Sequence, residues 1–171
     1  MTRTLEVLDR GQPITFSFED LLKYHGPSAP GGVAHAFKVL ERALPLLDPG
    51  GPCERRKIVV ETAFGGPGAR DAFEMVTRAV TGDRYHVDPA LARPERGRTL
   101  ERFVFRLGYR DRRVALVLRE GFVTDEFLDL ARTEERTAEQ ERRLDAMKRE
   151  MADRVMGHAA GEVYDTEDAA Q

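Results

Sequence analysis

His25 is the side chain of this sequence that is best placed to do chemistry. It ends an amphipathic segment and is followed by an irregular stretch, residues 26–32, rich in glycine and proline, before an apolar helix begins at Val33. A histidine beside a new helix N-terminus can hold a small polar ligand, an anion or a metal ion. We therefore predict a ligand-binding corner here, with Ser28 among its binding residues.

A carboxylate within an apolar strand is the second candidate. Glu61 interrupts the β-branched run from Ile58 to Phe64, which is typical of an interior strand. Either strand alternation turns Glu61 to solvent, or the side chain is buried and paired. Buried without a partner, it would have a raised pKa and could act as a general acid or base. We predict His25 and Glu61 as catalytic proton-transfer partners, which requires that both face one cavity.

A glycine-rich turn follows this strand and opens another helix. Free backbone N–H groups at such a helix start can bind a phosphate or a carboxylate. The turn has neither the Walker A pattern nor the dinucleotide fingerprint, so a simple sharp connection stays an alternative. The predicted ligand-binding residues of this segment are Gly65, Gly66, Gly68, Arg70 and Asp71.

A divalent, zinc-like metal ion is a further possibility. Of the four histidines, His25 and His86 are the predicted metal ligands, joined by Glu61 or Asp71 as oxygen donors. Taken singly, a histidine is more often a structural residue than a ligand. Ser28 is not assigned as a nucleophile, since no G-x-S-x-G elbow is present, and Cys53 lies in a turn-like stretch without a catalytic setting.

The elements that must position these residues follow from apolar periodicity. Alternation predicts hairpins over 5–16 and over 102–118, and a strand over 57–64. Helical spacing predicts helices from 18 to about 25, from 33 to a stop or kink at Pro45, from the glycine turn to about 81, and over 124–132 and 138–156. The stripe Leu144, Met147, Met151 and Val155 is either core or a homodimer seam. We predict an α+β fold with a mixed or antiparallel sheet, helices packed on it and a long C-terminal amphipathic helix.

Composition limits the function classes. The chain has 171 residues, of which 41% are hydrophobic and 33% charged, and this favours one soluble domain over 1–165 with a disordered tail at 166–171. The net charge of −3 argues against nucleic-acid and membrane-surface binding. One cysteine excludes internal disulfides and a cysteine-built zinc site. No signal or membrane-spanning segment is found, so we expect a cytoplasmic protein.

The corner also resembles a known family. The FmdE-like family of formylmethanofuran dehydrogenase proteins has a corner with the motif His-Gly-His-x-Cys-Pro-Gly. In this chain His25 matches the first histidine, and Pro30-Gly31 match the closing Pro-Gly. Pro27 and Ala29 stand where the family has its second histidine and its cysteine. Further similarities are Val60-Glu61, residues 71–74 and Thr81-Gly82, and the resemblance extends over about 4–165. It implies an α+β core with a site at the histidine corner, and it carries over His25, Glu61 and Asp71. The family accompanies molybdenum or tungsten formylmethanofuran dehydrogenases in methanogens. The family's cysteines are absent here, which argues against thiolate metal ligation and redox chemistry.

Two functions follow as hypotheses. The first is a small-molecule-binding member of that family, a metal-assisted non-redox enzyme that uses a histidine–carboxylate pocket on a small polar or anionic molecule. The second is a non-catalytic accessory or assembly protein that acts through homodimerisation or docking on a partner. Substitution of His25 and Glu61 separates the two hypotheses.

Overall fold

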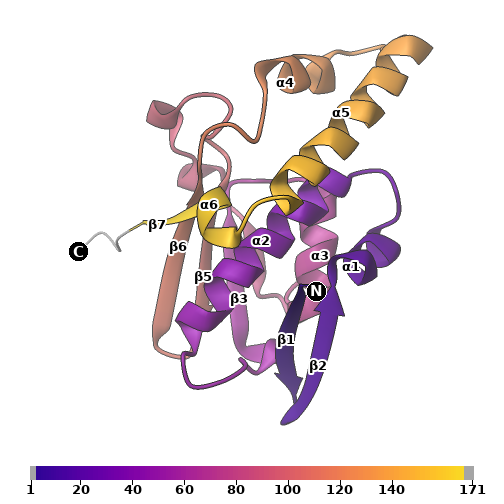
Figure 1. Cartoon of the computed structure of the whole chain (residues 1–171). Helices are drawn as coiled ribbons and strands as arrows, with labels where there is room; N and C mark the ends of the chain where they lie inside the picture. Colours follow the sequence, from indigo (N-terminus) through magenta and orange to yellow (C-terminus); the bar gives the residue numbers. More distant parts are fainter. Residues whose placement is uncertain (1–2, 168–171) are drawn as a thin grey trace.

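A five-stranded sheet with helices on one face organises the chain in the computed structural model, which describes residues 3–167 (Figure 1). The elements are β1 (Thr4–Asp9), β2 (Gln12–Ser17), α1 (Phe18–His25), α2 (Pro30–Leu47), β3 (Ile58–Thr62), α3 (Pro67–Thr77), β4 (Tyr85–Val87), β5 (Val104–Tyr109), β6 (Arg112–Leu118), α4 (Asp125–Arg132), α5 (Ala138–Met156), α6 (Ala160–Val163) and β7 (Tyr164–Glu167). Short 3-10 turns lie at Arg55–Lys57, Pro89–Leu91 and Pro94–Arg96. The predicted α+β class is confirmed.

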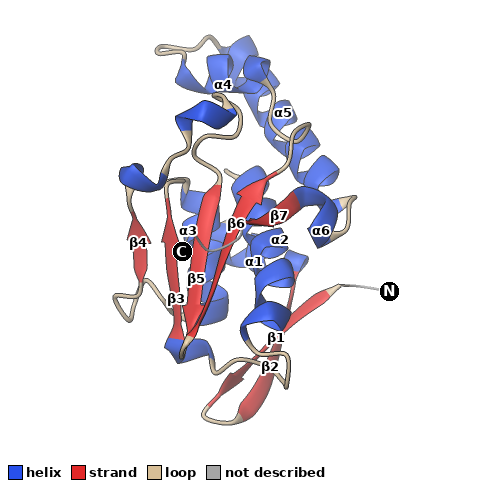
Figure 2. Cartoon of the chain, turned by 90° about the vertical axis from the view of Figure 1, so that its left-hand side faces the viewer, coloured by secondary structure: helices blue, strands red, loops and turns tan. Residues whose placement is uncertain are grey.

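The sheet has the strand order β4-β3-β5-β6-β7. The short β4 pairs parallel with β3, and all the other neighbours are antiparallel. The predicted hairpin is β1–β2, which forms a separate two-stranded sheet joined to the rest by a bridge between Leu8 and Glu54. Figure 2 looks onto the sheet face that has no helix in front of it, with α1, α2 and α3 behind. The sheet is therefore covered on one face only.

Strand alternation divides the side chains between these two faces. Val60, Phe105 and Leu116 are fully buried and belong to the core beneath the helices. Their neighbours along each strand point to the other face. One row across that open face consists of His86, Glu61, Arg106, Ala115 and Glu167. The open face is thus lined by charged and small residues.

Helix α2 lies at the centre of the core. It begins at Pro30, earlier than the predicted Val33, because proline is favoured in the first helical turn, where no N–H partner is required. Pro45 does not end the helix, which continues to Leu47. Although α2 is the most buried helix, no helix within residues 3–167 is long and apolar enough to cross a membrane.

Helix α5 has the predicted bounds and starts with a capping box formed by Thr137 and Gln140. Its predicted apolar stripe is buried, from Leu144 at 2% exposure to Val155 at 0%, and α5 packs on α2. The stripe is therefore core in the single chain. Strand β7 includes Thr166 and Glu167, so the ordered domain extends past the predicted boundary at 165. The rest of the predicted tail lies outside the described residues.

Candidate functional site

Three side chains from three segments form a hydrogen-bonded chain at the predicted corner. His25, the last residue of α1, places Nδ1 2.8 Å from Oδ2 of Asp71 on α3. On the other side of the ring, Nε2 lies 3.2 Å from the hydroxyl of Ser28 in the loop before α2. The His25 side chain is only 4% exposed, whereas Ser28 is exposed. A hydroxyl open to solvent is thus joined through a buried imidazole to a carboxylate.

The chemistry of the partners determines the tautomer of His25. A carboxylate accepts hydrogen bonds, so Nδ1 carries the proton and donates it to Asp71. In the neutral ring Nε2 is then an acceptor, and the Ser28 hydroxyl donates to it. A proton acceptor next to a hydroxyl, oriented by a carboxylate, is the arrangement that activates a serine or a polar ligand for proton transfer. The corner can therefore work as a general base.

The backbone at the corner is held in place by glycine. Gly26, directly after His25, has a φ of 91° and a ψ of −173°, a conformation that is essentially restricted to glycine. Its N–H donates to the Leu22 carbonyl and closes α1. The Ser28 carbonyl in turn accepts a hydrogen bond of 3.1 Å from Lys148 on α5. These constraints fix where the imidazole and the hydroxyl lie.

The predicted glycine turn has a structural explanation. A Cβ at Gly68 would collide with the Ala29 backbone, so this glycine allows the starts of α2 and α3 to pack closely. A Cβ at Gly66 would overlap the Phe64 ring, and Gly65 lies in a more open position beside Val87. None of the three pockets identified within residues 3–167 is lined by these glycines. Their predicted role in ligand binding stays a prediction.

Arg70 and Asp71, by contrast, do belong to the corner. One guanidinium nitrogen of Arg70 lies 3.8 Å from the Asp71 carboxylate oxygen that does not bind His25. The Arg70 side chain is more than half exposed. The predicted ligand-binding set thus contributes Ser28, Arg70 and Asp71 to one place.

Glu61 is not part of this corner, so the structure does not bring the predicted catalytic pair of His25 and Glu61 together. Val60 and Thr62 are buried beneath the helices, so the intervening Glu61 points to the open face of the sheet, where it lies 3.4 Å from Arg106. His25 lies among the helices on the opposite face, against α3. The sheet separates the two groups.

The predicted metal pair is separated in the same way. His86 lies beside Glu61 in the register of β3 and β4 and is exposed on the open face, so it cannot share a metal ion with His25. Within residues 3–167, no group of three or more histidine, cysteine, aspartate or glutamate side chains is arranged to hold a metal ion. At the corner, the imidazole of His25 and the carboxylate of Asp71 bind each other. The structure therefore does not bring the predicted ligands His25 and His86 together, and a divalent metal ion stays a prediction from the sequence.

Sequence reasoning set aside a nucleophilic role for Ser28, because no G-x-S-x-G elbow is present. His25 and Ser28 are three residues apart across a glycine–proline turn, and this spacing was the available signal. The third member, Asp71, comes from 46 positions further along the chain, and only the packing of α1 on α3 brings it to the imidazole.

Comparisons with known proteins add no family. No protein-family model matches this chain, and no curated protein matches it significantly. The resemblance of the histidine corner to the FmdE-like family therefore stays a prediction from the sequence.

Proposed function

We propose that this protein binds a small polar molecule at the Ser28–His25–Asp71 corner and transfers a proton there in non-redox chemistry. The observation that carries the proposal is the continuous hydrogen-bonded chain, with 2.8 Å from Asp71 to the imidazole and 3.2 Å from the imidazole to the hydroxyl. The resemblance of the corner to the FmdE-like family supports the same location.

The roles of the three residues follow from their contacts. Asp71 orients the imidazole and stabilises its protonated form. His25 takes the proton from the Ser28 hydroxyl, or from a ligand hydroxyl or water that occupies the same position. Arg70, on the exposed side of Asp71, binds an anionic group of the ligand. Acyl transfer and hydrolysis need this set of groups and no redox cofactor.

A fluorophosphonate probe tests whether Ser28 is activated. In the labelling step, the Ser28 oxygen forms a bond to phosphorus, fluoride leaves and the hydroxyl proton passes to His25. The chain has two serines, and Ser17 is an internal control because its hydroxyl caps α1 and accepts from the Asp20 N–H. We expect peptide mass spectrometry to find the label on Ser28 and not on Ser17.

Variants complete the experiment. His25→Asn should abolish labelling of Ser28, and Asp71→Asn should slow it by about tenfold or more, with circular dichroism showing that both variants are folded. Equal labelling of Ser28 in His25→Asn and in the unmodified protein would refute the proton-transfer role. A folded protein that is not labelled at Ser28 would refute activation of the hydroxyl.

The second candidate is an accessory protein that docks on a partner or forms a homodimer. The shape of the chain favours it, because α4 and the first half of α5 extend beyond the sheet (Figure 1). The buried stripe of α5 is already used in the core, so a homodimer would need another surface. Light scattering coupled to size-exclusion chromatography measures the oligomeric state. A dimer in this measurement, together with no fluorophosphonate label on Ser28, would favour the accessory function.

A further inference from the structure

The open face of the sheet has a groove on the side of the molecule away from the corner. It has a volume of about 640 Å³, a size typical of small-molecule sites. Strands β3, β5 and β6 form its floor, which faces the viewer in Figure 2. The floor is made of small residues, which leave the space between their longer neighbours free: Val59, Gly108 and Ala115.

Charged side chains surround this floor, and their balance is positive. Five cationic residues and two carboxylates line the groove: Lys57, Arg93, Arg106, Arg110, Arg113, Glu61 and Glu167. Both carboxylates already have an arginine partner, since Arg106 lies 3.4 Å from Glu61 and Arg93 lies 2.8 Å from Glu167. The groove thus has more positive charge than its own carboxylates neutralise, in a chain whose net charge is −3.

The excess cations lie together at one end. Within the described part of the chain, no carboxylate lies within ion-pair distance of Lys57, Arg110 or Arg113. Arg110 is held in the hairpin turn, with its guanidinium 4.9 Å from the centre of the Tyr109 ring. Guanidinium groups bind the oxygens of phosphates and carboxylates through paired hydrogen bonds.

We propose that this groove binds a small molecule that carries phosphate or carboxylate groups, independently of the corner on the helical face. The anionic groups lie against Arg110, Arg113 and Lys57, and the body of the molecule covers the floor at Gly108 and Ala115. The groove has a limited volume, and the cations at its other end are already paired with Glu61 and Glu167. Both features favour a small ligand over an extended polymer.

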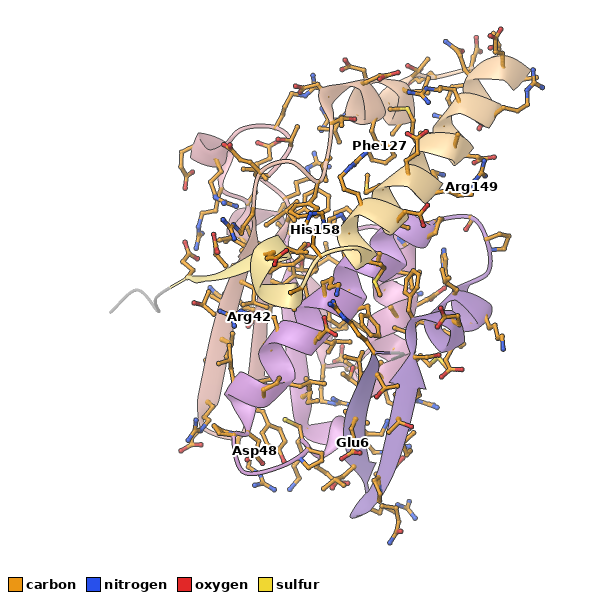
Figure 3. All side chains as sticks on the ribbon, viewed as in Figure 1. Glu6, Arg42, Asp48, Phe127, Arg149 and His158 are labelled. Atoms are coloured by element: carbon orange, nitrogen blue, oxygen red, sulfur yellow. The ribbon has the colours of Figure 1, made fainter. Side chains whose placement is uncertain are left out.

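Isothermal titration calorimetry at low salt tests the proposal with two probes, inorganic pyrophosphate and citrate. The test variant is Arg110→Gln/Arg113→Gln, which removes two cations of the groove. The matched control is Arg142→Gln/Arg149→Gln, because both of these arginines are exposed on α5, and Arg149 points away from the sheet (Figure 3). We expect the test variant to bind either probe at least about tenfold more weakly, and the control to change by less than about twofold.

A second variant tests the floor instead of the charge. Gly108 has no positive φ, and a Cβ there would only reach ordinary contact, 3.9 Å from Val59 and from the Arg112 carbonyl. Gly108→Val should therefore fold and fill the groove, and we expect about fivefold or greater weakening with an unchanged melting temperature. His25→Asn should bind both probes normally, which separates this site from the proposed function.

The probes also distinguish the ligand class. Tighter binding of pyrophosphate indicates phosphate groups, and tighter binding of citrate indicates carboxylates, either of which supports the proposal. Absence of binding by both probes would overturn it, as would equal weakening in the test and control variants. Displacement of the bound probe by a single-stranded oligonucleotide at lower concentration would overturn it in favour of a nucleic-acid surface.

Discussion

Stability should decrease steeply in mild acid because His35 is buried in its neutral form. This residue of α2 has no exposed surface, and its Nδ1 lies 2.8 Å from the Tyr164 hydroxyl. Its ring packs against Phe103, with 4.8 Å between ring centres, and Nε2 has no hydrogen-bond partner among the described residues. Burial lowers the pKa of His35 from 6.5 to about 3. Between about pH 3 and pH 6.5, His35 is therefore neutral in the folded protein and protonated in the unfolded chain.

The sign and the size of the effect follow from this difference. Below pH 6.5 the unfolded chain binds a proton at His35 that the folded chain does not, so acid stabilises the unfolded state. The free energy of unfolding then falls by about 1.4 kcal/mol for each pH unit until the folded pKa is reached. Between pH 7 and pH 5 the loss from this one residue is about 2 kcal/mol, a substantial part of the roughly 5–15 kcal/mol of an ordinary domain.

Urea unfolding followed by circular dichroism at pH 7 and pH 5 measures this loss. The reference variant is His35→Asn, whose side-chain amide lies near the position of Nδ1 and can still bond the Tyr164 hydroxyl, but does not titrate. The other titrating groups are common to both proteins and cancel in the comparison. We expect the unmodified protein to lose about 2 kcal/mol more than His35→Asn. Equal losses in the two proteins would refute the reasoning.

Three other predictions concern single residues of the core and the corner. Burial raises the pKa of Cys53 to about 11, so Ellman's reagent at pH 8 should react with this thiol only after the protein is unfolded. Gly26→Ala should lower the free energy of unfolding by about 1–3 kcal/mol, measured by urea titration, because alanine is strained at a φ of 91°. Arg55→Leu should lower it by about 3 kcal/mol, because the buried guanidinium donates to the Val76 and Met75 carbonyls and its loss leaves them without a donor; calorimetric melting measures this.

The elements that sequence reasoning placed correctly have strong local signals. The hairpin of β5 and β6 shows alternating apolar residues on both strands with a turn between them, and α5 has a capping residue at Thr137 and an apolar stripe at helical spacing. Helix α6 and strand β7 were missed, because Tyr164–Glu167 has only one apolar residue and becomes a strand through its pairing with β6. The local sequence thus predicts a helix or strand when its own residues show the apolar periodicity or a capping residue, and not when the element forms only through pairing with a distant strand.

The corner was predicted as a place, but the pairing of His25 with Asp71 for proton transfer was not. The irregular stretch after His25 marks the end of one helix and the start of another, and both are visible in the sequence. The partner of His25 depends on how α1 packs on α3, a contact between segments about 46 residues apart. Glu61 was chosen instead because a carboxylate in an apolar strand is a strong signal by itself.

The face of the sheet to which a strand residue points decides whether that residue can be the partner of His25. On a sheet covered on one face only, a side chain can meet the helices only if its neighbours two positions away are buried with it. Val60 and Thr62 are buried, so Glu61 points to the opposite face and can pair only with groups that share the open face, such as Arg106. A carboxylate on a helix has no such restriction. Asp71 on α3 can therefore contact the His25 imidazole, whereas Glu61 on β3 cannot. The His25–carboxylate pair of the corner is thus formed by residues of two helices, α1 and α3.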